Sequence, residues 1–454
     1  MKKQQYMPIW IHILMYFIVV FAIVSFFWPF VMADKHPAFY IKDGEVWIVP
    51  DGKEEPARML GATNTVVPSI QVTPNGKWAF YQHGGDLFKV RTSNPGEATK
   101  LLSNEIGHFV ISEDGRKLIC QKPSENYGNS DYFVCDFNGN KTFLAEGVQG
   151  VLKEYGDNKN FYYRAEGKLF YKKWGKEPVL LTEGYDEFGL LGKWVYWTEK
   201  NKGEYDGEAE YGLYFAKNGK VKKVAGNLTS PYLIHTDGDF TFYFVSTGER
   251  KEWWGVKAGQ TPFLTYTDRD DMLNFQVQGD TLYALERCEQ DKLANVKMAS
   301  NGDLYKYKIG NGRLHSRKLI KENVMSYNTG EKLLYIYDAA GKGFEIYDGK
   351  KLKRVTENEY MAVLDNSKAE LIFIDEVRWV PGDAGEGHEI IMGTLKSYKN
   401  GKSKVIAEDV MFAHYFGDRL FYIKKDGLYM KKGYKEVKID SKAEQLLAPV
   451  TNKY

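Results

Sequence analysis

The sequence of 454 residues has few cysteines, no excess of either charge and a single long hydrophobic run. Its three cysteines, Cys120, Cys135 and Cys288, are too few for a disulfide-scaffolded fold. The 62 basic and 60 acidic residues nearly cancel and form no basic block, so we expect no nucleic-acid partner. Tyrosine (32), phenylalanine (26) and glycine (44) are abundant, and this mixture is typical of antiparallel sheets joined by turns.

The hydrophobic run extends from Pro8 to Ala33 and follows Lys2 and Lys3. A helix of this length crosses a bilayer core, which needs about 20 apolar residues, and the lysines favour a cytoplasmic N-terminus. We therefore expect residues 1–34 to form a cytoplasmic leader and one transmembrane signal-anchor helix, with residues 35–454 outside the cell membrane. The alternative is secretion, because Val31-Met32-Ala33 has the small-residue spacing of a signal-peptide cleavage site.

The rest of the chain repeats one phrase: an aromatic strand, a turn with Gly or Asp, a strand with Leu-Tyr or Leu-Phe, a polar turn and a short apolar strand. A further turn and strand precede several copies, so each copy predicts a four-stranded blade, and the period of about 42 residues fits propeller blades. We predict an all-β fold, a propeller with eight to ten units in one ring; two stacked five-bladed rings are the alternative. The lead strands of the ten copies begin near Phe39, Trp78, Leu118, Phe161, Val195, Phe242, Leu282, Leu333, Leu371 and Leu420.

Two of the turns carry a family resemblance. Residues 73–77 (Thr-Pro-Asn-Gly-Lys) and 112–116 (Ser-Glu-Asp-Gly-Arg) each run straight into an apolar strand. These phrases resemble the WD40-like repeat of TolB-type propellers, and the aromatic rhythm of the other units is similar to bacterial extracytoplasmic propellers of unassigned function. The resemblance implies the fold but no activity, because propellers host many unrelated functions.

The first unit lacks a strand before Phe39, because the hydrophobic run occupies that place. The tail Gln445–Val450 is a candidate to supply this strand and to latch the ring. Pro449 indicates that the strand is short or lies at an edge.

No catalytic constellation is evident in the sequence. It has no His-Glu-x-x-His pair, no Gly-x-Ser-x-Gly elbow and no Walker-type phosphate loop. Three carboxylates, Asp268, Asp270 and Asp271, gather on one turn, where oxygen ligands could hold Ca²⁺. Asp is also an ordinary turn residue, so this is a weak candidate, and we expect no other cofactor.

The candidate contact residues lie in long loops and in one tryptophan pair. The insertion 379–389 interrupts a hairpin, and its contact candidates are Trp379, Asp383, His388 and Glu389. Similar long tips at 122–131 and 200–210 would fall on the same face of the ring, which we predict to be the contact surface. Trp253 and Trp254 could anchor a partner, although one of an adjacent pair is expected to be core.

Cys120 and Cys135 lie on the two arms of one predicted hairpin. A symmetric hairpin would place them opposite one another, where an oxidising compartment could join them in a disulfide. The alternative is that both are buried thiols that pack as small apolar side chains.

These observations lead to a functional hypothesis with two alternatives. We expect a non-enzymatic binding or scaffold module, held at the membrane, whose partner is a protein or an envelope polymer. One alternative is a carbohydrate-active envelope enzyme with carboxylates at the central channel. The other is a purely structural protein whose ring spaces other components.

Overall fold

The computed structural model describes residues 36–447 except 64–68, 104–105, 113, 124–128, 149, 155–159, 174, 192–193, 203–209, 229–233, 238, 247–250, 268–273, 291–298, 311–312, 331–332, 339–342, 359, 366–370, 382–388 and 400. All regular elements in these residues are β-strands, as predicted. The predicted transmembrane helix over residues 1–34 lies outside them. Within the described ranges, no helix has the length and apolar character that a bilayer span requires.

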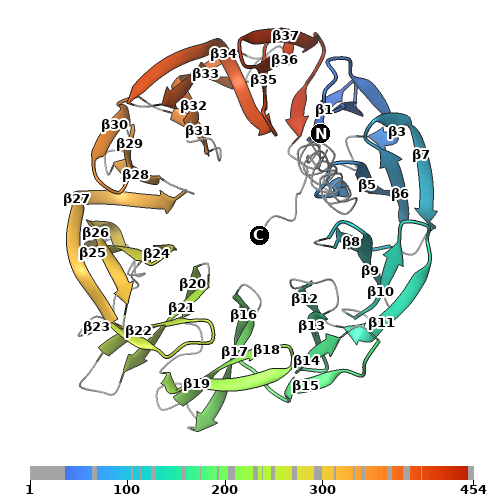
Figure 1. Ribbon diagram of the computed structural model, residues 1–454. Helices are drawn as coiled ribbons and strands as arrows, with labels where there is room; N and C mark the ends of the chain where they lie inside the picture. The colour runs from blue at the N-terminus through green and yellow to red at the C-terminus, as the bar shows by residue number, and fades with distance from the viewer. Residues whose placement is uncertain are drawn as a thin grey trace, which may run out of the picture.

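The strands form ten blades around one axis (Figure 1). Six blades are separate four-stranded antiparallel sheets. The other four form two seven-stranded sheets, because the long strands β27 (Arg313–Thr329) and β34 (Lys402–Phe416) are each the outer strand of one blade and the innermost strand of the next. The single ring therefore has as many blades as the sequence has copies of the repeat.

The blades are numbered 1 to 10 in chain order, and each has an innermost, a second, a third and an outer strand. The innermost strands are β38 (Gln445–Leu447), β4 (Gln71–Val72), β8 (His108–Ile111), β12 (Gly150–Glu154), β16 (Phe188–Leu191), β20 (Ile234–Asp237), β24 (Phe275–Gln278), the second part of β27, β31 (Tyr360–Asp365) and the second part of β34. The second strands are β1 (Ala38–Lys42), β5 (Trp78–His83), β9 (Lys117–Pro123), β13 (Asn160–Ala165), β17 (Trp194–Lys202), β21 (Phe240–Ser246), β25 (Thr281–Gln290), β28 (Leu334–Asp338), β32 (Leu371–Pro381) and β35 (Arg419–Lys424).

The two remaining positions of each blade follow in the same order. The third strands are β2 (Glu45–Val49), β6 (Asp86–Arg91), β10 (Ser130–Asp136), β14 (Lys168–Lys173), β18 (Glu210–Lys217), β22 (Lys251–Lys257), β26 (Ala299–Gly310), β29 (Phe344–Tyr347), β33 (Glu389–Lys399) and β36 (Gly427–Lys432). The outer strands are β3 (Ala57–Thr63), β7 (Asn94–Leu102), β11 (Lys141–Val148), β15 (Val179–Thr182), β19 (Lys220–Leu228), β23 (Phe263–Thr267), the first part of β27, β30 (Leu352–Thr356), the first part of β34 and β37 (Lys435–Asp440). Every predicted lead strand is the second strand of a blade.

The aromatic rhythm of the sequence arises from pairs across the second and third strands. In blade 2, Tyr81 lies opposite Phe88, and their rings stack with centroids 5.1 Å apart. Blade 10 repeats the arrangement with Tyr422 and Tyr429, whose centroids are 5.6 Å apart. Such cross-strand aromatic pairs stabilise a sheet, which explains why most copies of the repeat have an aromatic residue in both strands; in blade 3 the second strand, Lys117–Pro123, has none.

The core is divided into ten hydrophobic clusters, one at each contact between neighbouring blades. Alternate residues of one strand pack in different clusters: Leu334 and Ile336 face blade 7, whereas Tyr335 and Tyr337 face blade 9. A blade alone would leave two apolar faces in water, and closing the ring buries both of them.

The two turns with the family resemblance share one set of hydrogen bonds. In blade 2, Thr73 Oγ1 donates to Asn75 Oδ1 at 2.8 Å and accepts a bond from Trp78 N at 3.1 Å. In blade 3, Ser112 Oγ donates to Asp114 Oδ1 at 2.8 Å and accepts one from the next strand. The hydroxyl and the Asx side chain thus fix the turn that leads into the second strand.

The predicted latch closes the ring. Strand β38 pairs antiparallel with β1, and Leu446 lies opposite Tyr40. Leu446 and Tyr40 also pack in the cluster between blades 10 and 1. Residues 445–447 therefore supply the strand that blade 1 lacks at its start, which confirms the prediction; residues 448–450 lie outside the described part of the chain.

Candidate functional site

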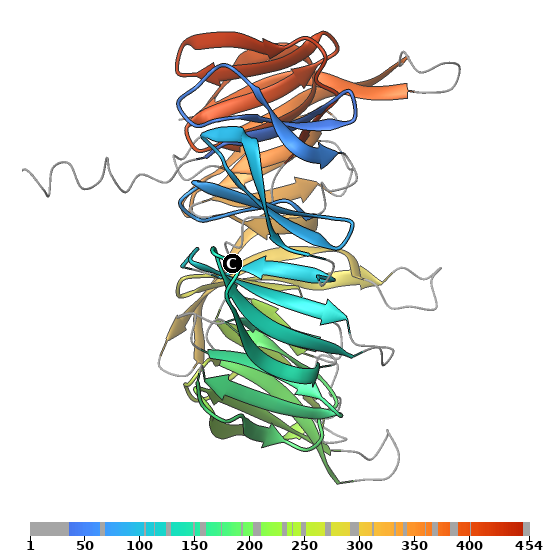
Figure 2. The ribbon, with the colours of Figure 1, turned by 90° about the vertical axis from the view of Figure 1, so that its right-hand side faces the viewer.

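Four long hairpins project from one face of the ring, named here the hairpin face (Figure 2). They connect the second and third strands of blades 3, 5, 7 and 9, whereas two-residue turns make the same connection in blades 2, 4 and 10. The strands that carry the long tips predicted at 122–131, 200–210 and 379–389 run toward the same face, whereas residues 124–128, 203–209 and 382–388 of these tips lie outside the described part of the chain. The hairpin of blade 7, formed by β25 and β26, is a fourth member that sequence reasoning missed.

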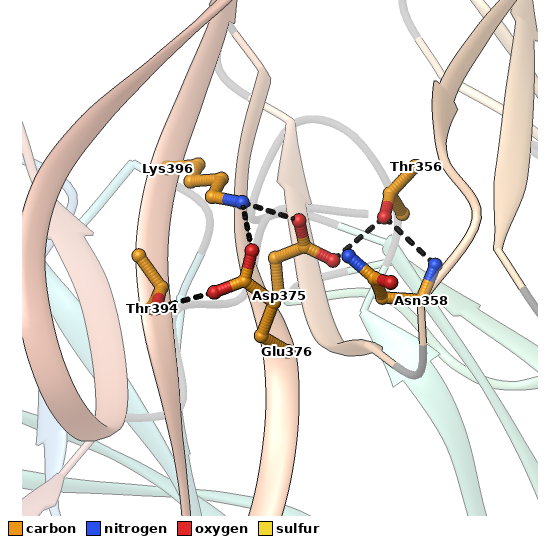
Figure 3. Close-up of polar contacts among 6 residues, drawn as sticks. All are labelled: Thr356, Asn358, Asp375, Glu376, Thr394 and Lys396. Carbon is orange, nitrogen blue, oxygen red and sulfur yellow. Dashed lines mark hydrogen bonds and ion pairs between the residues drawn. The ribbon is translucent and has the colours of Figure 1, made fainter.

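At the base of the blade 9 hairpin, Asp375 is only 3% exposed and has partners in two blades (Figure 3). Its Oδ1 accepts a 2.7 Å hydrogen bond from Thr356 Oγ1, at the end of the outer strand of blade 8. Its Oδ2 accepts a 2.7 Å bond from Lys396 Nζ, which also donates to Glu376 Oε1 at 2.9 Å. Thr394 Oγ1 donates to the other oxygen of Glu376 at 3.1 Å, so both carboxylates are held.

The backbone turns sharply at this cluster. The pairing register shifts between Asp375 and Arg378, and Glu376 has a φ of +56°, which is rare for a residue with a side chain. A bulge of this kind re-aims neighbouring side chains, and here adjacent carboxylates both reach Lys396. The hydrogen bond from Lys396 is the main cause that lowers the pKa of Glu376. Burial alone would lower the pKa of Lys396, but its bonds to the two carboxylates raise it.

The blade 7 hairpin also has a buried carboxylate at its base. Glu286 is 3% exposed, accepts a 2.9 Å bond from Arg317 Nη2 and accepts another from the Tyr307 hydroxyl. Arg317 Nε donates to the Tyr307 oxygen at 3.0 Å, and its guanidinium lies 3.7 Å from the centroid of the Tyr305 ring. The hydrogen bond that Arg317 donates to Glu286 is the main cause of the raised pKa of Arg317.

In blade 5 the corresponding carboxylate, Glu199, borders an open cleft between blades 4 and 5. Glu199 Oε1 accepts a 2.7 Å bond from Trp197 Nε1, and the indole ring is buried between the blades. The cleft has a volume of about 530 Å³. Its lining residues are Thr182, Glu183, Gly184, Tyr185, Asp186, Glu199 and Lys200. With three carboxylates and one lysine, this cleft attracts positively charged groups.

The three hairpin bases differ in what they can do chemically. Asp375 and Glu286 are buried and ion-paired, so they hold their hairpins on the ring and are closed to a ligand. The cleft beside Glu199 is open to solvent and offers acidic side chains to a partner. The sequence carried a signal for all three, because each carboxylate lies within the second strand of a blade with a long hairpin, after the apolar residues that begin that strand.

The structure places the candidates of the insertion 379–389 only in part. Trp379 is 63% exposed on the hairpin face, where a partner can contact it. Glu389 pairs through its backbone with Pro381 at the start of β33, and its side chain is not described. Asp383 and His388 lie outside the described residues.

The two tryptophans of the pair differ in burial. Trp253 is 2% exposed and packs between blades 6 and 7, so it cannot contact a partner. Trp254 packs partly against the cluster between blades 5 and 6, and its Nε1 donates to Glu252 Oε2 at 2.9 Å. Trp253 is therefore the core member that we expected in an adjacent pair, and a contact role for the half-buried Trp254 stays a prediction.

The candidate calcium ligands Asp268, Asp270 and Asp271 lie outside the described residues. Among the side chains that the structure does describe, no three His, Cys, Asp or Glu residues are grouped closely enough to hold a metal ion.

Cys120 and Cys135 are both free and buried. The predicted register is wrong, because Cys120 lies opposite Phe133 and Cys135 lies opposite Leu118. The cysteines are thus diagonal neighbours in one cluster between blades 2 and 3. The Cβ–Cβ separation of diagonal neighbours is larger than the short separation that a disulfide requires. Burial is the main cause that raises the pKa of both thiols.

The ring of repeated four-stranded blades defines the chain as a β-propeller, and comparisons with known proteins agree with this class. No family model and no curated protein matches the sequence. Among solved structures, the chain is similar to a eukaryotic initiation factor, with 12% identity and a TM-score of 0.51 over 83% of this chain and 97% of that one.

Two further solved structures are similar at lower scores. TolB from Acinetobacter baumannii is 14% identical, with a TM-score of 0.26 over 50% of this chain and 61% of that one. The β-propeller domain of the Trilobed protease from Pyrococcus furiosus is 11% identical, with a TM-score of 0.30 over 72% and 99%. The expected resemblance to TolB-type propellers is confirmed, and it extends to the fold alone.

Proposed function

We propose that this protein is a membrane-anchored, extracytoplasmic propeller that binds a protein or an envelope polymer through its hairpin face, without catalysing a reaction. The observation that carries the proposal is the projection of four long hairpins from one face of a rigid ring. Elongated hairpins on alternate blades add surface without adding to the core, as expected for a contact surface. The hydrophobic run at 8–33 supports a location at the membrane.

Charge and exposure on the hairpin face suggest the chemistry of the partner. The cleft between blades 4 and 5 carries Glu183, Asp186 and Glu199, and favours cationic groups of a partner. Trp379 offers a large aromatic surface, and tryptophan is enriched at the energetic centres of protein interfaces. The proposed partner therefore presents lysine, arginine or amine groups together with an apolar contact.

A crosslinking experiment in intact cells tests the proposal. A photoreactive amino acid replaces Trp379 on the hairpin face or, as the matched control, Tyr434, which is 99% exposed in a turn on the opposite face. We expect one defined crosslinked product from position 379 and none of that mass from position 434. Replacing residues 203–209 and 382–388 by the two-residue Glu-Gly turn of blade 4 removes the product. Equal products from both positions, or none from 379, would contradict the proposal.

The carbohydrate-active alternative receives less support. It requires two carboxylates about 5–10 Å apart that converge on a sugar at the channel mouth. On the innermost strand of blade 6, Asp237 Oδ2 already accepts a hydrogen bond from Val277 N of blade 7. This carboxylate joins two innermost strands, which favours a structural role for it.

A further inference from the structure

Pairs of lysines face each other on the side of the ring opposite to the hairpin face. This side carries the turns between third and outer strands, and in three blades both residues of the last strand pair before the turn are lysines. The lysine face is defined by these pairs: Lys217 with Lys220 in blade 5, Lys399 with Lys402 in blade 9, and Lys432 with Lys435 in blade 10.

The pairing opposes the stability of the sheet. Like charges directly opposite in an antiparallel pair repel each other, and an acidic residue at either position would remove the conflict. The turn enforces the register: Asn218 and Gly219 both have positive φ, the geometry of the tight hairpin turn that Asn-Gly favours. On the hairpin face, the residue pairs next to the turns do not combine like charges: Lys42 lies opposite Glu45 in blade 1, and His83 lies opposite Asp86 in blade 2.

Protection of the sheet edges explains only one lysine of each pair, the one on the outer strand. Lysines on outer strands prevent edge-to-edge association between sheets. Lys217, Lys399 and Lys432, however, lie on third strands, whose backbone is paired on both sides. A local rule broken in the same way in three blades indicates a use outside the sheet.

Further exposed basic residues surround these pairs. Lys432 and Lys435 form ion pairs with Asp418 and Glu54, and the same face carries exposed carboxylates such as Glu177 in blade 4 and Asp348 in blade 8. The lysines of blades 5 and 9 are therefore the ones least balanced by acidic neighbours. The additional exposed residues are Lys173, Lys176, Lys222, Arg313, Lys351 and Lys404. An anionic surface that extends over several blades is the complement of such a distribution.

The chain enters the ring from the same side. Strand β1 runs toward the hairpin face, so His36 lies at the lysine face, where Arg419 Nη2 donates a 2.6 Å hydrogen bond to its carbonyl oxygen. In the sequence, only Asp34 and Lys35 separate this residue from the hydrophobic run. Two extended residues span about 7 Å. This is close to the Debye length of about 8 Å at physiological salt, within which charges on the ring feel a membrane surface.

We propose that the lysine face docks on anionic lipid headgroups and thereby orients the hairpin face away from the membrane. The inference rests on the proposed membrane anchor and adds a second, electrostatic contact to it. A single anchor would leave the ring free to tilt, whereas several lysines at an anionic surface hold the whole face parallel to it. The contact surface then points outward, toward partners in the envelope.

The test uses the full chain in nanodiscs of phosphatidylcholine alone or with phosphatidylglycerol. The measured quantity is the rate of amine acylation at each lysine, followed by peptide mass spectrometry. We expect Lys217, Lys220, Lys399 and Lys402 to react several-fold more slowly in the anionic nanodiscs, and high salt to abolish the difference. Lys442, exposed at the hairpin-face end of β37, is the internal control and reacts equally in both.

A charge-reversal variant separates docking from folding. Replacing the four lysines of blades 5 and 9 by glutamate reverses the charge of each pair but keeps two like charges opposite one another at an exposed turn. The repulsion within each pair is therefore unchanged, and the fold is retained. We expect the variant to lose the protection of Lys351 in anionic nanodiscs.

Equal acylation in both nanodiscs, with the chain still inserted, would refute the docking and leave the anchor intact. A chain that elutes free of lipid would instead refute the anchor, and protection by an added anionic polymer in phosphatidylcholine would assign the face to a polymer.

Discussion

Arg419 Nη2 donates a 2.6 Å hydrogen bond to the carbonyl oxygen of His36, across 383 positions of the sequence. Its Nη1 donates to the carbonyl oxygens of Pro50 at 3.0 Å and Lys53 at 3.3 Å, and the side chain is 1% exposed. One guanidinium from blade 10 therefore binds three carbonyls of blade 1. The chain already joins blade 10 to blade 1 through β38, and this guanidinium adds a buried side-chain contact to that closure.

Loss of this guanidinium is expected to weaken the closure. In an Arg419→Met variant the aliphatic stem still packs, but three carbonyl groups lose their donor in a buried place. We expect a loss of about 2–4 kcal/mol in the free energy of unfolding, in line with hydrogen bonds to charged donors. Thermal unfolding of the full chain in detergent measures it. Arg313→Met, at an exposed turn, is the matched control and should change stability by less than about 0.5 kcal/mol.

The same contact between blades predicts a dependence on pH. Asp440 at the end of blade 10 accepts bonds from the Tyr40 hydroxyl at 2.8 Å and from Lys42 Nζ at 2.9 Å. Burial alone would raise the pKa of Asp440, but hydrogen bonds from Lys42, from the backbone of Lys442 and from Tyr40 bring it below the ordinary value of 3.8. A depressed carboxyl pKa stabilises the folded state above the ordinary value, and this stabilisation is lost as the pH falls through the folded value.

We therefore expect the free energy of unfolding of the wild-type chain to fall below about pH 4, in part because Asp440 becomes protonated. An Asp440→Asn variant lacks this part of the loss. The variant is less stable at neutral pH, and its loss of stability between pH 6 and pH 3 is smaller. Unfolding by urea at a series of pH values measures both quantities. Parallel pH profiles for the two proteins would show that Asp440 titrates alike in the folded and unfolded chains.

Much of this fold could be predicted from the residues. The ten lead strands and the latch at Gln445–Leu447 were visible because aromatic alternation and turn residues act locally and follow a fixed spacing. The number of blades stayed open at eight to ten, because one or two copies of the repeat could equally be insertions or a hairpin cap. In the structure all ten copies are blades, and two pairs of them share the strands β27 and β34. Charged residues continue through both shared strands, so no break in the sequence marks the boundary between the blades.

The candidate site was harder to predict, because side-chain placement at hairpin bases depends on bulges. Asp375 faces Thr356 of the preceding blade by ordinary strand alternation, but Glu376 joins it at Lys396 where the register shifts just beyond Asp375. The same sensitivity explains the error at Cys120 and Cys135. The centre of the hairpin lies one residue earlier in the sequence than we predicted, and this moves the two cysteines from opposite to diagonal positions. Spacing along the chain indicates the face of a strand but not the exact register.

The pair of Asp375 and Lys396 is expected to behave as a coupled unit. Asp375→Ala leaves the mostly buried ammonium of Lys396 with only the exposed Glu376 as its partner. Breaking a buried ion pair on one side costs about 3–5 kcal/mol, whereas replacing both partners by apolar residues is often neutral. We expect the Asp375→Leu/Lys396→Met double variant to recover most of the stability that the single variant loses. Additive losses in denaturant unfolding would mean that the two residues act independently.

The two thiols between blades 2 and 3 give a prediction that separates packing from redox chemistry. The thiolate is the reactive form, and burial raises the pKa of Cys135 to about 11 and that of Cys120 further. In a Cys288→Ser background, we expect neither cysteine to be alkylated by iodoacetamide in the folded chain at pH 8, and both to be alkylated after unfolding without reductant. Intact mass spectrometry counts the added groups. Alkylation that requires prior reduction would instead demonstrate a disulfide, and with it a strand register different from the one described here.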